Sequence, residues 1–186
     1  MNQMTRIVAA PAGVAKARFT AAEFLRMIEA EVFGDDKIEL IEGEFYRMPP
    51  PGNDHSRRVI EVASALLGVV PKALVRAETG INLGDDTLVG CDAALLREAI
   101  TGRGMLTPAD LALVVEVAET TLSHDLGLKR RVYAEAGIPV YWVIDGARAV
   151  IHVHAEPVDG DYAEIHSVRF GQPIAVPGTD ATITLD

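Results

Sequence analysis

Cysteine is nearly absent from this chain, since Cys91 is the only one in 186 residues and no internal disulfide can form. Disulfides are typical of secreted proteins, so a chain without one is expected in the cytoplasm. No apolar run reaches the roughly 20 residues that a membrane-spanning helix needs. The first residues also lack the apolar core of a secretory signal peptide. These absences predict a soluble cytoplasmic protein. Its stability must come from its hydrophobic core.

Basic residues are also scarce, with 17 Lys and Arg against 27 Asp and Glu and a net charge of −10. This balance disfavours non-specific binding to nucleic acid, because neutralising phosphates requires basic side chains. A local basic patch could still form, although scattered solvated charges are the favoured interpretation. The candidates for such a patch are Arg57, Arg58, Arg76, Arg103, Lys129, Arg130 and Arg131. Glycine-rich phosphate-binding motifs are absent, and Cys91 has no neighbouring motif for thiol chemistry.

The length predicts one domain over residues 19–186, preceded by a loose arm over residues 1–18. A capping box of Thr20 and Glu23 predicts a helix to about residue 31. Two strands, 38–41 and 45–48, are expected to pair across a turn at residues 42–43. A second helix, capped by Asn53 or Asp54, is expected to run to about residue 70.

The second half of the chain predicts the centre of the sheet. Residues 73–96 favour three short strands with breaks at Gly80 and at residues 84–86. The apolar segment 111–117, a helix over 125–136 and the apolar segment 140–145 predict two parallel strands joined by a crossover. Antiparallel strands are expected after residue 146. The fold class is therefore α/β (α+β), with a mixed sheet flanked by helices and additional antiparallel strands.

One carboxylate stands out because it lies inside an apolar strand. Glu116 is surrounded by valines, and burying its charge is costly unless it is paired or binds a metal. Asp92 precedes another apolar segment and could share that metal, whereas a salt bridge from Glu116 to Lys129 is the competing structural interpretation. Tyr133 follows Lys129 by four residues, at the spacing of one helix face. Glu39, in an apolar segment, could face the same site or water.

These residues and their order resemble a known family. The resemblance begins with residues 39–44 and with His55 after a proline-rich turn, and it continues with Asp92 and residues 114–117. Its most specific part is the segment 120–145, which contains Asp125, Lys129 and the run 133–145. Together these motifs resemble the bacterial Uma family of putative restriction endonucleases, in the PD-(D/E)XK nuclease superfamily, over about residues 20–170.

The resemblance implies a metal-dependent endonuclease that hydrolyses nucleic-acid phosphodiester bonds, with DNA as the expected substrate. It implies that Asp92 and Glu116 bind Mg²⁺ or Mn²⁺. It also implies a catalytic role for Lys129, because the position two residues after Glu116, where the superfamily usually has lysine, is Ala118. The catalytic set is then Asp92, Glu116, Lys129 and Glu39, and His55 and Tyr133 are expected to contact substrate. Cys91 replaces the proline of the motif, which is not a ligand.

Two further expectations concern assembly and the rival function. Many enzymes that cut duplex DNA are twofold dimers, so a homodimer is expected, with apolar strands after residue 146 as the contact. The rival function is a non-catalytic interaction module that keeps a nuclease-like fold, which the acidic charge supports. A zinc site made of His152, His154 and His166 is disfavoured against histidines that face solvent.

Overall fold

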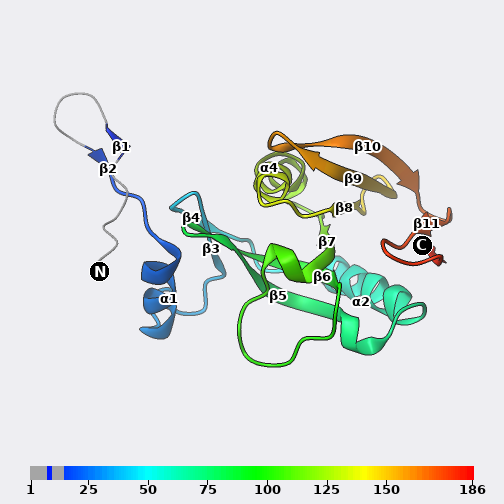
Figure 1. The fold of residues 1–186 in the computed structure, drawn as a ribbon, viewed down its shortest axis with the longest axis horizontal. Coiled ribbons are helices and arrows are strands. Elements are labelled where there is room, and N and C mark those ends of the chain that lie inside the picture. Colours follow the sequence, from blue (N-terminus) through cyan, green and yellow to red (C-terminus); the bar gives the residue numbers. More distant parts are fainter. Residues whose placement is uncertain (1–7, 10–14) are drawn as a thin grey trace. The chain divides into compact units, whose positions relative to one another are not determined.

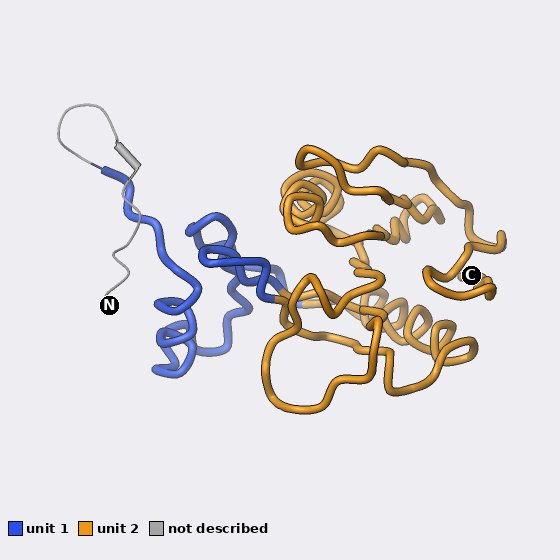
Figure 2. Tube along the Cα trace, viewed as in Figure 1, with its two compact units in different colours: residues 1–50, 82–89 blue, residues 51–81, 90–186 orange. Residues whose placement is uncertain are grey.

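The computed structural model describes residues 8–9 and 15–186 and divides into two compact units. Unit 1 comprises Met1–Pro50 and Asn82–Val89, and unit 2 comprises Pro51–Ile81 and Gly90–Asp186 (Figure 2). Of the expected N-terminal arm, residues 1–7 and 10–14 lie outside the described residues. Strands β1 (Val8–Ala9) and β2 (Ala15–Lys16) pair antiparallel. The single domain over residues 19–186 stays a prediction.

Unit 1 is built from one helix and a small antiparallel sheet. Helix α1 (Ala21–Glu29) begins with the expected capping box, in which Thr20 and Glu23 each bond the other's backbone N–H. Strands β3 (Ile38–Ile41) and β4 (Glu44–Arg47) pair antiparallel, and β3 also pairs with the start of β6 (Thr87–Leu96). A cluster of buried apolar side chains joins the helix to this sheet, namely Ala21, Phe24, Leu40 and Leu88.

The sheet of unit 2 has a parallel pair at its centre. Strand β7 (Leu111–Val117) lies parallel to β8 (Val140–Asp145), which confirms the crossover expected from the sequence. The later part of β6 pairs antiparallel with β7 on one side, and β5 (Val75–Gly84) pairs with β6. On the other side β9 (Val150–Val158) and β10 (Asp161–Arg169) follow as antiparallel strands.

Helices cover the two faces of this sheet (Figure 1). Helix α2 (Asn53–Leu67) packs Val59, Val62 and Leu66 against the main apolar cluster, which also takes in Trp142. The other face receives a helical run of α3 (Leu122–His124), a π-helix η4 (Asp125–Lys129) and α4 (Arg130–Glu135). The short elements are 3-10 helices η2 (Lys72–Leu74) and η3 (Pro108–Asp110), and the strand pair β11 (Ile174–Ala175) and β12 (Thr182–Ile183). The described helices include none long and apolar enough to cross a bilayer.

Three expectations about local structure are wrong. Two strands of 10 residues each, β5 and β6, replace the three short strands, and Gly80 lies inside β5 instead of ending a strand. A Cβ atom on Gly80 would lie 2.7 Å from Cε of Met105, so the glycine serves a close approach. Helix α2 is capped by Gly52 without a side-chain bond, so neither Asn53 nor Asp54 is its cap. The helical run begins at Leu122, before the expected start at Asp125.

The three histidines of β9 and β10 do not form a zinc site. Directly paired residues of an antiparallel sheet share a face, and His166 pairs with Val153. His152 and His154 flank Val153 and therefore lie on the opposite face. His154 is buried between the rings of Tyr141 and Tyr162, so the expectation that it faces solvent is wrong.

Burial of His154 predicts a loss of stability in acid. Burial lowers the pKa of His154 to about 4 from the ordinary value of 6.5. Below pH 6.5 the unfolded chain therefore binds a proton at this residue that the folded chain does not bind. The free energy of unfolding should therefore fall as pH drops from about 6.5 to 4, by on the order of 2 kcal/mol from this residue. Urea unfolding across this range should show a smaller loss for His154→Phe than for wild type. The exposed His166→Phe control should keep the wild-type loss, and equal losses in all three proteins would contradict this account.

Candidate active site

Asp92 and Glu116 lie on neighbouring strands of unit 2. The register of β6 and β7 pairs Ala93 with Val115, so one residue further along Asp92 stands opposite Glu116. Opposite residues of an antiparallel pair share a face of the sheet. Both carboxylates are about 5% exposed or less. Asp92 Oδ2 also accepts the backbone N–H of Val117 at 2.7 Å, so its side chain is held against the end of β7.

The buried carboxylate of Glu116 has two donors on the helical run that covers it. Oε1 of Glu116 accepts a hydrogen bond from Nζ of Lys129 at 2.8 Å and another from the hydroxyl of Tyr133 at 2.8 Å. Lys129 is 1% exposed, and its ammonium also donates to the carbonyl of Gly90 at 2.8 Å. Charge-assisted hydrogen bonds of this kind are the means by which a buried charge is tolerated. The structure therefore brings Asp92, Glu116, Lys129 and Tyr133 together.

Lys129 is the last residue of the π-helix η4, a widened turn that interrupts the helical run. Single π turns inside α-helices occur frequently at functional sites. Asp125, at the start of the same turn, is buried and accepts a hydrogen bond from the hydroxyl of Thr121, while its backbone carbonyl accepts one from Tyr141. Burial raises the pKa of Asp125, and the bond from Thr121 opposes that rise. Asp125 and Lys129 are four residues apart on one helical run and both are buried, and Lys129 binds Glu116.

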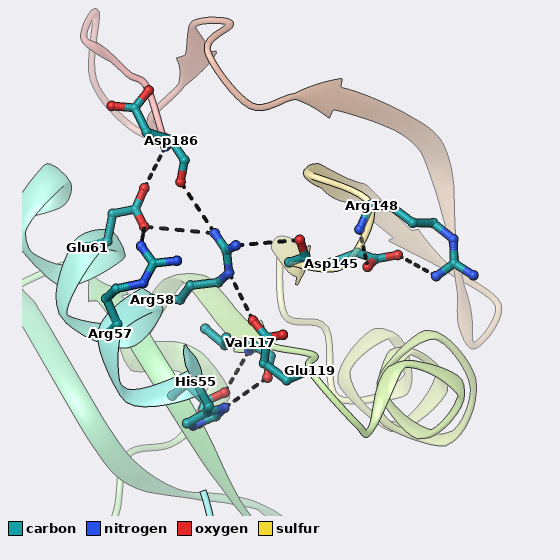
Figure 3. Close-up of polar contacts among 11 residues, drawn as sticks. His55, Arg57, Arg58, Glu61, Val117, Glu119, Asp145, Arg148 and Asp186 are labelled. Atoms are coloured by element: carbon teal, nitrogen blue, oxygen red, sulfur yellow. Dashed lines mark hydrogen bonds and ion pairs between the residues drawn. The ribbon is translucent and has the colours of Figure 1, made fainter. Parts of the chain in front are cut away.

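His55 lies in the first turn of α2 and contacts both strands of the site. Its Nδ1 lies 3.1 Å from the carbonyl oxygen of Val117, and its Nε2 lies 3.3 Å from Oδ1 of Asp92. Figure 3 shows the ring of His55 directed at Val117. The contact of His55 with substrate stays a prediction.

Arg58, one helical turn after His55, holds the loop that follows β7. Its Nε donates to Glu119 at 2.9 Å, its guanidinium lies 4.9 Å from the ring centre of Phe170, and it reaches the carbonyl of Gly146 (Figure 3). A Cβ on Gly146 would lie within 2.4 Å of both Glu119 Oε1 and Arg58 Nε, so this packing requires glycine. Arg58 is engaged in structural contacts within the protein.

One acidic residue of the site escaped the sequence analysis. Glu78 of β5 offers a carboxylate oxygen that lies within 4.8 Å of ligand atoms of both His55 and Asp92, and these three can hold a metal ion. Glu78 is an exposed residue with φ of 48°, a left-handed conformation that non-glycine residues adopt rarely. Nothing in the sequence marks Glu78, because it stands in no recognisable motif.

Glu39 and Cys91 are two further buried residues that the sequence analysis considered. Glu39 is a buried residue of β3 in unit 1, and its role as an additional acid of the site stays a prediction. Cys91 is buried, and burial raises the pKa of its thiol well above the ordinary value. The thiol is therefore protonated at neutral pH and is a poor nucleophile, in agreement with the sequence analysis.

Comparison with solved structures supports the fold. A crystal structure of a putative nuclease of DUF820 from Anabaena variabilis is similar to this chain with a TM-score of 0.67 and 21% sequence identity. The match covers 89% of this chain and 94% of that one. A search of curated proteins found no match.

A family model decides the relationship. The model described as Uma2, putative restriction endonuclease, matches residues 21–186, which is nearly the whole chain. The matched range contains every residue of the site described above. The chain therefore belongs to the Uma2 family of putative restriction endonucleases.

Proposed function

We propose that the chain is a metal-dependent endonuclease that hydrolyses phosphodiester bonds in DNA. The observation that carries this proposal is the cluster of Asp92 and Glu116 on paired strands, with the ammonium of Lys129 bound to Glu116. Two acids with a lysine beside them fit phosphodiester chemistry, in which a metal and a cation share the developing negative charge. Membership of the Uma2 family supports the same function.

The donor set fits a hard divalent cation. Asp92 and Glu116 offer carboxylate oxygens, which are the ligands that Mg²⁺ prefers, and Mn²⁺ accepts the same ligands. A divalent ion held there would polarise the phosphodiester and lower the pKa of a water molecule. Asp92 Oδ2 is committed to the N–H of Val117, which fixes the side chain and directs Oδ1 toward His55 and the site.

The remaining residues position groups and stabilise charge. Lys129 carries a buried ammonium that can orient the attacking water or stabilise the charge that develops on the phosphoryl oxygens. Tyr133 holds Glu116 through its hydroxyl and is also proposed to contact substrate. His55 is proposed to contact a phosphate, and Glu39 to add a further acid. The enzyme is proposed to act in the cytoplasm.

A second function has two observations in its favour. Oε1 of Glu116 already accepts two hydrogen bonds within the protein, and the net charge of −10 repels nucleic acid. In a non-catalytic interaction module, the Glu116–Lys129 pair would serve stability alone. The two functions predict different effects of removing Lys129 on metal binding, DNA cleavage and stability.

The decisive variant is Lys129→Met, which removes the ammonium and keeps most of the side-chain volume. If the chain is a nuclease, Lys129→Met should still bind Mg²⁺ or Mn²⁺, because a protonated lysine cannot be a ligand. Its cleavage of DNA should fall by about a hundredfold or more, as when one stabilising donor is lost. Asp92→Asn and Glu116→Gln should lose both metal binding and cleavage. Calorimetric metal titration and a plasmid-cleavage assay measure these outcomes.

Thermal melting of the same proteins tests the structural alternative. Removing one partner of a buried ion pair leaves an uncompensated charge and costs about 3–5 kcal/mol, whereas removing both costs much less. If wild type neither binds metal nor cleaves DNA, and Lys129→Met melts early while the double variant with Glu116→Gln recovers, the pair is structural and the nuclease proposal fails. Arg131→Met, which removes an exposed cation paired with Glu135 on the same helical run, is the matched control and should change stability by less than about 1 kcal/mol.

The proposed nuclease is expected to be a twofold homodimer. Strand β10 ends the sheet of unit 2 and exposes about half of Ile165, so an apolar side chain is available there for a partner subunit. Light scattering at micromolar concentration should give twice the mass of 19.9 kDa. Ile165→Lys should shift the dimer toward monomer, while Val158→Lys, next to the turn of the same hairpin, shows whether the contact extends to its tip. A monomeric wild type would remove the dimer from the proposal.

A further inference from the structure

The hydrogen bond between His55 and Val117 fixes the state of the imidazole. A backbone carbonyl oxygen can only accept a hydrogen bond, so the Nδ1 atom that lies 3.1 Å from Val117 must carry a proton. In the neutral ring the other nitrogen, Nε2, then presents a lone pair. A carbonyl or carboxylate that orients the far nitrogen in this way is typical of histidines that bind metals.

The lone pair of Nε2 is directed at another electron-rich atom. Nε2 lies 3.3 Å from Oδ1 of Asp92, and this approach is favourable only when a positive charge lies between or on the two groups. Two neighbouring ligands of one metal ion, each about 2.1 Å from it, stand about 3.0–3.4 Å apart for angles between octahedral and tetrahedral values. The observed separation fits two ligands of the same ion, and it equally fits an ion pair between a protonated imidazole and Asp92.

A third ligand comes from β5. The carboxylate of Glu78 lies within 4.8 Å of the ligand atoms of His55 and Asp92, and Glu78 is exposed, so its side chain can adjust. The left-handed backbone at Glu78, with φ of 48°, costs on the order of 1 kcal/mol in a non-glycine residue. Such strain is found at functional sites, where a side chain must point in one direction. Here it is observed in Glu78, one of the three residues that can hold a metal ion.

We propose that His55, Glu78 and Asp92 form a binding site for a divalent transition-metal ion such as Mn²⁺, which they hold more tightly than Mg²⁺. An imidazole ligand favours transition metals, whereas Mg²⁺ prefers oxygen ligands alone. The inference rests on the proposed function, because it shares Asp92 with that site and names the ion that the nuclease uses. It adds His55 and Glu78 to the two ligands, Asp92 and Glu116, of the proposed function.

Val117 orients two of these ligands at once. Its N–H donates to Oδ2 of Asp92, and its carbonyl accepts from Nδ1 of His55. The residue before it, Glu116, binds Lys129. A single stretch of β7 thus places the nitrogen ligand, the shared carboxylate and the buried ammonium next to one another. An ion bound between His55 and Asp92 would lie beside Val117, which is one residue from the Glu116 that binds Lys129.

Electron paramagnetic resonance of Mn²⁺ tests the site without any need for catalysis. Wild type should bind Mn²⁺ more tightly than Mg²⁺ in competition, and pulsed spectra of bound Mn²⁺ should show coupling to one imidazole nitrogen. His55→Gln should lose the nitrogen coupling, bind Mn²⁺ about tenfold or more weakly, and lose its preference over Mg²⁺. Glu78→Gln should weaken both ions while keeping the nitrogen coupling. Circular dichroism of each variant checks that it folds.

Matched controls and the separate cleavage assay make the outcomes distinct. His166→Gln and Glu98→Gln make the same chemical changes at exposed positions outside the group and should leave Mn²⁺ binding unchanged. Absence of nitrogen coupling in wild type, or unchanged Mn²⁺ affinity in folded His55→Gln, would overturn the inference. If wild type cleaves DNA with Mg²⁺ and folded His55→Gln keeps the wild-type affinity for Mn²⁺, the proposed function stands and this inference fails. If Mn²⁺ binds as described and no DNA is cleaved, the inference stands and the proposed function fails.

Discussion

The burial of one carboxylate, that of Glu116, is the constraint on which the rest of the site depends. An ionised carboxylate inside an apolar strand costs several kcal/mol unless it is paired and hydrogen-bonded. Lys129 and Tyr133 supply that compensation from one helical run, each at 2.8 Å. The run must therefore pack on the Glu116 face of the sheet, and it does so with a π turn that ends at Lys129. A chain selected for stability alone could place a valine there, which makes function the better explanation of the carboxylate.

At the end of β7, side chains from neighbouring elements join this buried pair to form the site. Val117 binds Asp92 through its N–H and His55 through its carbonyl, so residues from β6, β7 and α2 meet at one point. Arg58 of α2 binds Glu119, in the loop that follows β7, and the carbonyl of Gly146 (Figure 3). The scaffold around Val117 is thus held from several sides, which is the preorganisation that electrostatic catalysis and metal binding both require.

The sequence predicted those parts of the fold in which local pattern and burial agree. Strands β7 and β8 are almost wholly apolar, and a helix between them allows only a crossover, so their parallel pairing could be expected. Glu116 could be singled out because a charge among valines is unusual, and Lys129 could be singled out through the resemblance to the Uma family. Glu78 could not, since its place depends on a left-handed backbone and on contacts between distant segments. Gly80 was misinterpreted as a break for a similar reason, because its close contact is with Met105, a residue distant in the sequence.

The central claim is that Asp92 and its neighbours at the end of β7 form a divalent-cation site for phosphodiester hydrolysis. A crystal of the protein soaked in Mn²⁺, with an anomalous difference map measured at the manganese edge, tests it most directly. The account predicts a peak at roughly 2.0–2.3 Å from a carboxylate oxygen of Asp92, on the side that faces His55. A saturated crystal with no peak at Asp92, and with Lys129 still bound to Glu116, would contradict the claim and leave the buried pair as a structural feature.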